Sequence, residues 1–187
     1  MTTETLYTIL NEVNHSKENR KKHTQMVIDN PKLLPNILDI VFDVDHKISV
    51  RAAWLLEFTA REDLNLISPY LDQITLEMPK VHLDPAVRPI AKICEYITAA
   101  YFHKNANSIK DTLTDTHKER IIALSFDYLI SDKKIAPQAY SMNTLFLLGK
   151  EFDWVHPELI LILERGYPNG SPAYKARSRK LLDKLKK

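Results

Sequence analysis

Apolar residues recur along most of the chain with the spacing of an α-helix. In "TETLYTILNEV", Leu6, Leu10 and Val13 stand at positions i, i+4 and i+7, which places them on one side of a helix. The same spacing returns in "SVRAAWLLEFTA" and "KERIIALSFDYLI", whereas the period-two alternation of strands is missing. The pattern predicts an all-α fold. We expect about ten helices, over residues 3–13, 17–29, 31–43, 46–61, 66–78, 85–102, 117–131, 136–150, 157–165 and 172–185.

In or just before the first turn of four of these helices, a side chain that can cap a helix precedes a proline. The oxygen of a capping side chain accepts from an unpaired N–H of the first turn, and a proline at the first helical position has no N–H to leave unpaired. We therefore expect caps at Asn30, Ser68, Asp84 and Ser171. Pro89 falls inside a predicted helix instead, where it cannot donate to the carbonyl of Pro85 and should bend the first turns.

The second helices of successive pairs can be aligned with one another. The aligned segments are "ISVRAAWLLEF", "PAVRPIAKICEY", "PQAYSMNTLFLL" and "PAYKARSRKLL", which begin at residues 48, 85, 137 and 172. Their starts are 37, 52 and 35 residues apart. The widest gap contains a polar insertion at 103–117, which has room for one helical turn of its own. A helix-pair period near about 37–40 residues is typical of α-solenoids, in which each pair buries its apolar side against the next pair.

Two of these segments resemble HEAT/armadillo repeats. The resemblance lies in Asp45 with "SVRAAWLLEF" and in Asp84 with "PAVRPIAKI", because HEAT units often place an acidic residue between their helices and Val-Arg early in the second helix. It is clearest over residues 43–97, and it implies a right-handed α-α superhelix of about five antiparallel helix pairs. It also implies a hydrogen-bonded ladder between neighbouring repeats, to which Asp45 with Arg51 and Asp84 with Arg88 correspond in residue type. Arg51 and Arg88 are candidates either for this ladder or for contacts with a partner.

The composition indicates one globular domain over residues 1–187. Hydrophobic residues make up 44% of the chain and charged residues 27%, which is enough to bury a core. The net charge is only +2, but seven Lys and Arg against Asp183 give residues 172–187 a balance of +6 and leave −4 for the rest. Such a basic C-terminal helix is more often a solvated last helix than a site for an anionic partner, and both interpretations stay open here. A second basic cluster consists of Lys17, Arg20, Lys21 and Lys22.

The sequence lacks the motifs of several common metal-binding, catalytic and phosphate-binding sites. The seven histidines include no HExxH pair, no GxSxG is present, and three glycines do not make a Gly-rich phosphate loop. Cys94, the single cysteine, lies in an apolar stripe, where we expect a buried structural thiol. Glu57 and Arg61 are four residues apart, which predicts a surface ion pair. We therefore expect no catalytic residue, no metal ion and no cofactor.

The location of the protein is also constrained. The N-terminal residues "MTTETLYTILNEVNHSKENR" lack the basic segment, apolar run and cleavage site of a signal peptide. No apolar run approaches the roughly 18 residues that suggest a membrane span. A single cysteine allows no intramolecular disulfide. We expect a cytoplasmic protein without a membrane partner.

Three classes of function fit this picture. A helical array presents a large surface, which favours a non-enzymatic scaffold or adaptor for a protein or peptide. The alternative is a nucleic-acid-binding protein, because some HEAT-like proteins are DNA alkylation repair glycosylases that hold the duplex on a basic concave face. A helical enzyme whose site combines sequence-distant residues is the third. The candidate partner-binding residues stand in one column of the aligned second helices: Arg51, Arg88, Tyr140 and Lys175.

Overall fold

The computed structural model describes residues 3–131 and 134–186, and this part of the chain contains helices and loops but no strand. The all-α prediction is therefore confirmed. Lys187, which belongs to the predicted basic end, lies outside the described residues. The α-helices are α1 (Thr3–Glu12), α2 (Lys17–Asp29), α3 (Leu34–Phe42), α4 (Ser49–Glu62), α5 (Leu71–Glu77), α6 (Asp84–Tyr101), α7 (Ser108–Thr112), α8 (Asp115–Ile130), α9 (Ile135–Leu148), α10 (Val155–Gly166) and α11 (Pro172–Leu185). Four short 3-10 helices are η1 (Pro31–Leu33), η2 (Leu64–Leu66), η3 (Ser68–Tyr70) and η4 (Met78–Lys80).

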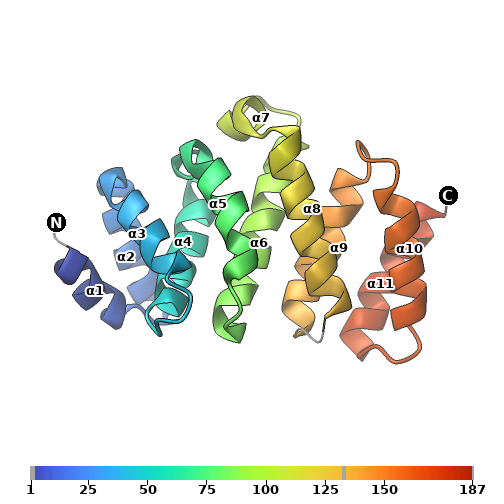
Figure 1. Cartoon of the computed structure of the whole chain (residues 1–187), viewed down its shortest axis with the longest axis horizontal. Helices are drawn as coiled ribbons and strands as arrows, with labels where there is room; N and C mark the ends of the chain where they lie inside the picture. Colours follow the sequence, from blue (N-terminus) through green and yellow to red (C-terminus); the bar gives the residue numbers. More distant parts are fainter. Residues whose placement is uncertain (1–2, 132–133, 187) are drawn as a thin grey trace.

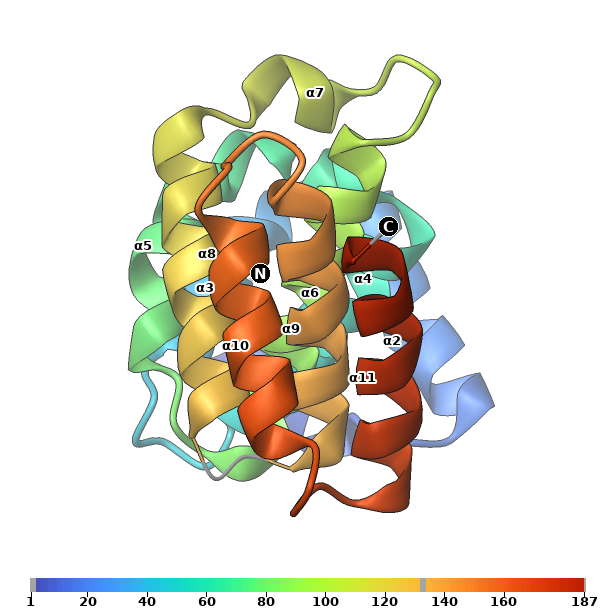
Figure 2. The ribbon, with the colours of Figure 1, turned by 90° about the vertical axis from the view of Figure 1, so that its right-hand side faces the viewer.

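The helices follow one another in chain order along the molecule (Figure 1). Helix α4 contacts α2 and α6, α6 contacts α9, and α9 contacts α11; we call α2, α4, α6, α9 and α11 the second-helix layer. On the other side, α5 contacts α8 and α8 contacts α10; these three helices and α3 form the first-helix layer. Figure 2 shows α5, α8 and α10 on one side of the molecule and α9 and α11 on the other. In residues 3–131 and 134–186, no helix combines the length and the hydrophobicity that are needed to span a lipid bilayer.

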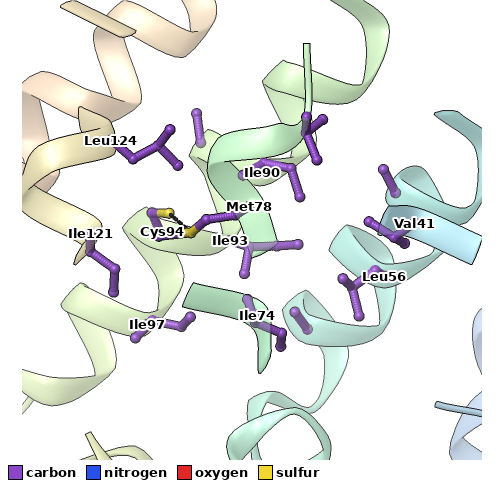
Figure 3. Packing of buried hydrophobic residues seen from close by; sticks show 14 of the residues in the cluster. Val41, Leu56, Ile74, Met78, Ile90, Ile93, Cys94, Ile97, Ile121 and Leu124 are labelled. Atoms are coloured by element: carbon purple, nitrogen blue, oxygen red, sulfur yellow. Dashed lines mark hydrogen bonds between the residues drawn. The ribbon is translucent and has the colours of Figure 1, made fainter. Parts of the chain in front are cut away.

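The apolar stripes of both layers meet in one cluster of buried residues that extends from α1 to α11. Near its middle, Ile74 of α5 faces Leu56 of α4 and Ile93 of α6 (Figure 3). Cys94 lies in the same region with its Sγ 3.6 Å from the Sδ of Met78, and the cysteine is 2% exposed. The interpretation of Cys94 as a buried core residue is confirmed.

The segment predicted as one helix over 66–78 differs most from the expectation. It begins with the 3-10 helices η2 and η3, and α5 starts only at Leu71. Pro69 and Pro79 lack N–H groups near the two ends of this segment, so regular α-helical bonding is confined to the residues between them. The chain then tightens again into η4.

Only one of the four expected caps forms. The hydroxyl of Ser171 accepts from the N–H of Tyr174 at 3.2 Å and begins α11. Asn30 is followed by the 3-10 helix η1, and Ser68 is the first residue of the 3-10 helix η3, so neither side chain makes a capping bond. Asp84 lies inside the first turn of α6. The three expectations are wrong because a proline fixes where a helix can start but not which atom bonds its first N–H groups. Side-chain caps form at Ser16, Asn107 and Thr114, none of which precedes a proline.

The polar insertion 103–117 contains the expected helical turn, α7. Asn107 caps it, and the hydroxyl of Ser108 donates to the side-chain oxygen of Asn65 at 2.6 Å. Ile109 points into the core and is buried. The insertion is therefore fastened to η2 and α6, which α7 contacts.

Candidate binding surface

Three hollows lie along the outer surface of the second-helix layer, which we call the second-helix face. The N-terminal hollow, of about 300 Å³, lies between α2 and α4 and is lined by Lys17, Arg20, Lys21, Thr24, Arg61 and Glu62. The Trp54 hollow, of about 240 Å³, is lined by Trp54, Asp84, Pro85, Val87, Arg88, Lys134, Ala136 and Pro137. The C-terminal hollow, of about 410 Å³, lies between α9 and α11 and is lined by Asn143, Ala173, Ala176, Arg177, Lys180, Leu181 and Lys184.

The N-terminal hollow is basic. Lys17 and Lys21 are one helical turn apart on α2, and neither has an acidic side chain within ion-pair distance among the residues described. The guanidinium of Arg20 lies over the ring of Phe58 at 5.0 Å, a contact that holds the charge at the surface of α4. Three members of the basic cluster seen in the sequence, Lys17, Arg20 and Lys21, therefore line one hollow, whereas Lys22 lies 3.7 Å from the carboxylate of Glu12. The charges of Lys17 and Lys21 are available to a partner.

The C-terminal hollow is basic as well. Arg177, Lys180 and Lys184 stand at i, i+3 and i+7 on α11, so they share one side of that helix. Arg177 and Lys180 have no acidic partner within ion-pair distance in the described ranges, and the ammonium of Lys184 lies 5.3 Å from the ring centre of Phe146. The small side chains of Ala173 and Ala176 leave the space open between α11 and α9.

The centre of the second-helix face holds a paired charge. Glu57 of α4 is 5% exposed, and its carboxylate accepts from the guanidinium of Arg88 of α6 at 2.6 Å. Burial raises the pKa of Glu57 above its ordinary value, although the positive charges of Arg88, Lys92 and Arg61 act in the opposite direction. The expected surface ion pair of Glu57 with Arg61 is wrong: the guanidinium of Arg61 bonds Glu62 instead. Glu57 joins neighbouring second helices because its side chain points toward α6 and not along α4.

A second polar group extends this central cluster to α9. The ammonium of Lys92 donates to Glu95 at 2.6 Å and lies 4.4 Å from the ring centre of Tyr140. The amide of Asn143 donates to the other carboxylate oxygen of Glu95 at 3.0 Å. These contacts tie α6 to α9 and leave the central charges matched.

Pro89 is accommodated without interrupting α6. It cannot donate to the carbonyl of Pro85, and that carbonyl accepts instead from the indole N–H of Trp54 at 3.0 Å. The bond joins α4 to α6 and fixes the orientation of the indole at the edge of the Trp54 hollow. Trp54 is accordingly a partly buried wall of that hollow, packed against the core.

The four candidate residues do not gather at one point. Arg88 and Tyr140 both belong to the central cluster, the first through Glu57 and the second through Lys92. Arg51 donates to the backbone carbonyl of Asn11 at the end of α1. Lys175 lines none of the three hollows.

The aspartates and arginines of the HEAT resemblance bond other residues and not one another. Asp45, in the exposed turn before α4, lies 3.5 Å from His82, and Asp84 lies 3.4 Å from the ammonium of Lys134. Arg51 and Arg88 sit further along their helices and bond Asn11 and Glu57. The implied ladder does not form among these residues, because each aspartate stands in or beside a turn, where it meets the loop before the next helix of the second-helix layer.

Two buried side chains that could act as nucleophiles, Lys118 and Cys94, are held in their protonated forms. Lys118, 5% exposed, donates to Asp115 and Glu151 at 2.8 Å each and to the hydroxyl of Tyr101 at 3.2 Å. Burial alone would lower the pKa of Lys118, but the bonds to these carboxylates raise it, the opposite of what a lysine nucleophile needs. Burial also raises the pKa of Cys94 to about 12, which keeps the thiol protonated. No group of three or more His, Cys, Asp or Glu that could hold a metal ion occurs in the part of the chain that the structure describes.

Similarity to known proteins adds no assignment to this surface. Comparisons with protein-family models, with curated proteins and with solved structures each returned no match for the chain. The function assigned to the second-helix face therefore depends on the residues and contacts described above.

Proposed function

We propose that the protein is a non-enzymatic scaffold or adaptor, built as a right-handed array of about five HEAT-like helix pairs. Its second-helix face binds an extended acidic segment of a partner protein. The observation that carries the proposal is the placement of Lys17, Lys21, Arg177 and Lys180. These cations lie beside hollows at the two ends of one face, and among the described residues no acidic side chain is within ion-pair distance of them.

The dimensions of the face define the length of the segment. Neighbouring helices lie about 8–10 Å apart, so the steps from α2 through α4, α6 and α9 to α11 add up to roughly 35 Å. An extended chain advances about 3.3 Å per residue, so about a dozen residues would reach from one basic hollow to the other. A shorter segment would occupy one hollow at a time and lose the gain of two linked contacts.

Nucleic acid is the second candidate, and the same unpartnered cations favour it. Tyr140 beside Lys92 supplies an aromatic ring on which a base could stack. The central carboxylates oppose it, because Glu57 and Glu95 match the charges of Arg88 and Lys92 between the two basic ends. A continuous phosphate backbone would cross this neutral stretch without forming ion pairs.

The test measures binding of fluorescent oligoglutamate by anisotropy at about 50 mM salt. A peptide of about 16 residues should bind at least about tenfold more tightly than one of about 6, and added salt should weaken it. Lys17→Glu/Lys21→Glu and Arg177→Glu/Lys180→Glu should each weaken the longer peptide about tenfold.

Lys47→Glu/Lys104→Glu is the matched control, because both lysines are exposed and line none of the three hollows. It should bind the longer peptide as the unaltered protein does. Equal losses in the control and the end variants would contradict the proposal. Tighter binding of single-stranded or duplex DNA of the same charge would assign the face to nucleic acid instead.

A further inference from the structure

The Trp54 hollow differs from the two basic hollows in the chemistry of its walls. Its walls are mostly apolar and are formed by Trp54, Pro85, Val87, Ala136 and Pro137. Its volume of about 240 Å³ is below the 300–1,000 Å³ that is typical of sites for whole small molecules. The hollow therefore has the size and lining for one apolar side chain.

We propose that the Trp54 hollow is the anchor site of the face, and that it takes a single leucine-sized or aromatic side chain from the acidic segment. The inference rests on the proposed function and names the residue type that the segment must carry. Buried apolar anchors commonly supply most of the affinity of a protein interface, while surrounding charges add register and rate. The basic hollows would hold the acidic residues on either side of the anchor.

The walls of the hollow are fixed before any partner arrives. The indole N–H of Trp54 donates to the carbonyl of Pro85 at 3.0 Å, so the ring that forms one wall is held in a single orientation. Pro85 and Pro137 add side chains with almost no rotamer freedom to lose. A preformed site costs little conformational entropy on binding, which favours a strong contact from a small area.

The charges at the rim select what may flank the anchor. Arg88 is 40% exposed, and its acidic partner Glu57 lies buried beneath it. Lys134 is 73% exposed and stands 3.4 Å from Asp84, the one carboxylate among the residues that line the hollow. An approaching segment thus meets an apolar floor beside the exposed guanidinium of Arg88 and the Lys134–Asp84 pair, whose carboxylate is also 54% exposed. Only Arg88 has its acidic partner buried away from the segment, so it complements one acidic residue next to the anchor.

The experiment compares two peptides of about 16 residues, one of glutamate alone and one with a single central leucine. Burying the leucine should tighten binding by about tenfold or more. Ala136→Phe fills the hollow and should remove this advantage while leaving the all-glutamate peptide unaffected. Ala106→Phe, at an exposed loop position away from the hollows, is the matched control and should retain the advantage.

A second measurement covers the case in which Ala136→Phe disturbs the fold. In a Trp154→Phe background only Trp54 emits, since the chain has two tryptophans. The leucine peptide should shift that emission to shorter wavelength, and the all-glutamate peptide should not. Equal binding of the two peptides, or a leucine advantage that survives a folded Ala136→Phe, would overturn the anchor. Failure of both peptides to bind would overturn the proposed function and the anchor together.

Discussion

The centre and the ends of the second-helix face use charge in different ways. At the centre, Glu57 and Arg88 belong to adjacent helices and their bond is partly buried. At the ends, Lys17, Lys21, Arg177 and Lys180 lie beside hollows, and no acidic side chain in the described residues is within ion-pair distance of them. Paired charge at the centre thus serves the fold, whereas unpaired charge at the ends of the layer is available to a partner.

The difference follows from the position of each helix in the second-helix layer. Helices α4, α6 and α9 each have a second-layer neighbour on both sides, so a side chain between them meets another side chain. Helix α11 has a second-layer neighbour, α9, on one side only in the described residues, and its basic residues line the C-terminal hollow between the two helices. The two regions should therefore respond differently to substitution.

The largest effect is expected at the centre. Arg88→Met removes the partner of a buried carboxylate and should lower the free energy of unfolding by about 2–3 kcal/mol, less than for a fully buried pair because Arg88 is partly exposed. Urea denaturation measures the loss. In Glu57→Leu/Arg88→Met no charge is left unpaired, so most of the stability should return. A double variant no more stable than the single one would show that the pair has little structural role.

The same pair predicts a dependence on pH. The folded-state pKa of Glu57 is raised, so the folded protein holds this proton more firmly than the unfolded chain does. Its contribution to stability is then greatest below about pH 4.5 and falls as the pH rises through the folded-state pKa. Removing Arg88 takes away a charge that lowers this pKa, so Arg88→Met should lose more stability near pH 7.5 than near pH 4. Urea denaturation at both pH values measures this, and in Glu57→Gln/Arg88→Met the difference should vanish.

A smaller effect is expected at Trp54. Trp54→Phe keeps the aromatic ring but leaves the Pro85 carbonyl without its donor, which should cost about 1 kcal/mol of unfolding free energy. Pro89→Ala restores a backbone N–H that can bond this carbonyl. Trp54→Phe should therefore cost less in the Pro89→Ala background, as a double-mutant cycle would measure. If Trp54→Phe cost the same in both backgrounds, the indole hydrogen bond would not compensate for the N–H that Pro89 lacks.

The smallest effect on stability is expected at the ends. Lys17→Gln/Lys21→Gln and Arg177→Gln/Lys180→Gln remove exposed charges without partners, so each should change the free energy of unfolding by less than about 0.5 kcal/mol. The same variants should weaken oligoglutamate binding. Thermal melts and anisotropy titrations on the same samples compare the two effects. A large loss of stability would show that these side chains support the fold after all.

The sequence anticipated the helices better than the contacts between them. Periodic apolar residues predicted the helical segments, and the stripe that contains Cys94 predicted its burial. The side-chain partners of Arg51, Arg88 and Glu57 were not predicted, because they lie on other helices, at sequence separations of 31 residues for Glu57–Arg88 and 40 for Arg51–Asn11. Spacing along one helix suggested Glu57 with Arg61, and packing overrode it.

What the sequence by itself determined is the helical character of the chain, most helix positions and the basic character of both ends. These depend on local spacing and composition, which a single chain displays directly. Only the tertiary structure decided which charges are paired, that the carbonyl freed by Pro89 meets Trp54, and that three hollows share one face. The physical reason is that a buried polar group takes whichever partner packing brings within about 3 Å, and this depends on how neighbouring helices stack.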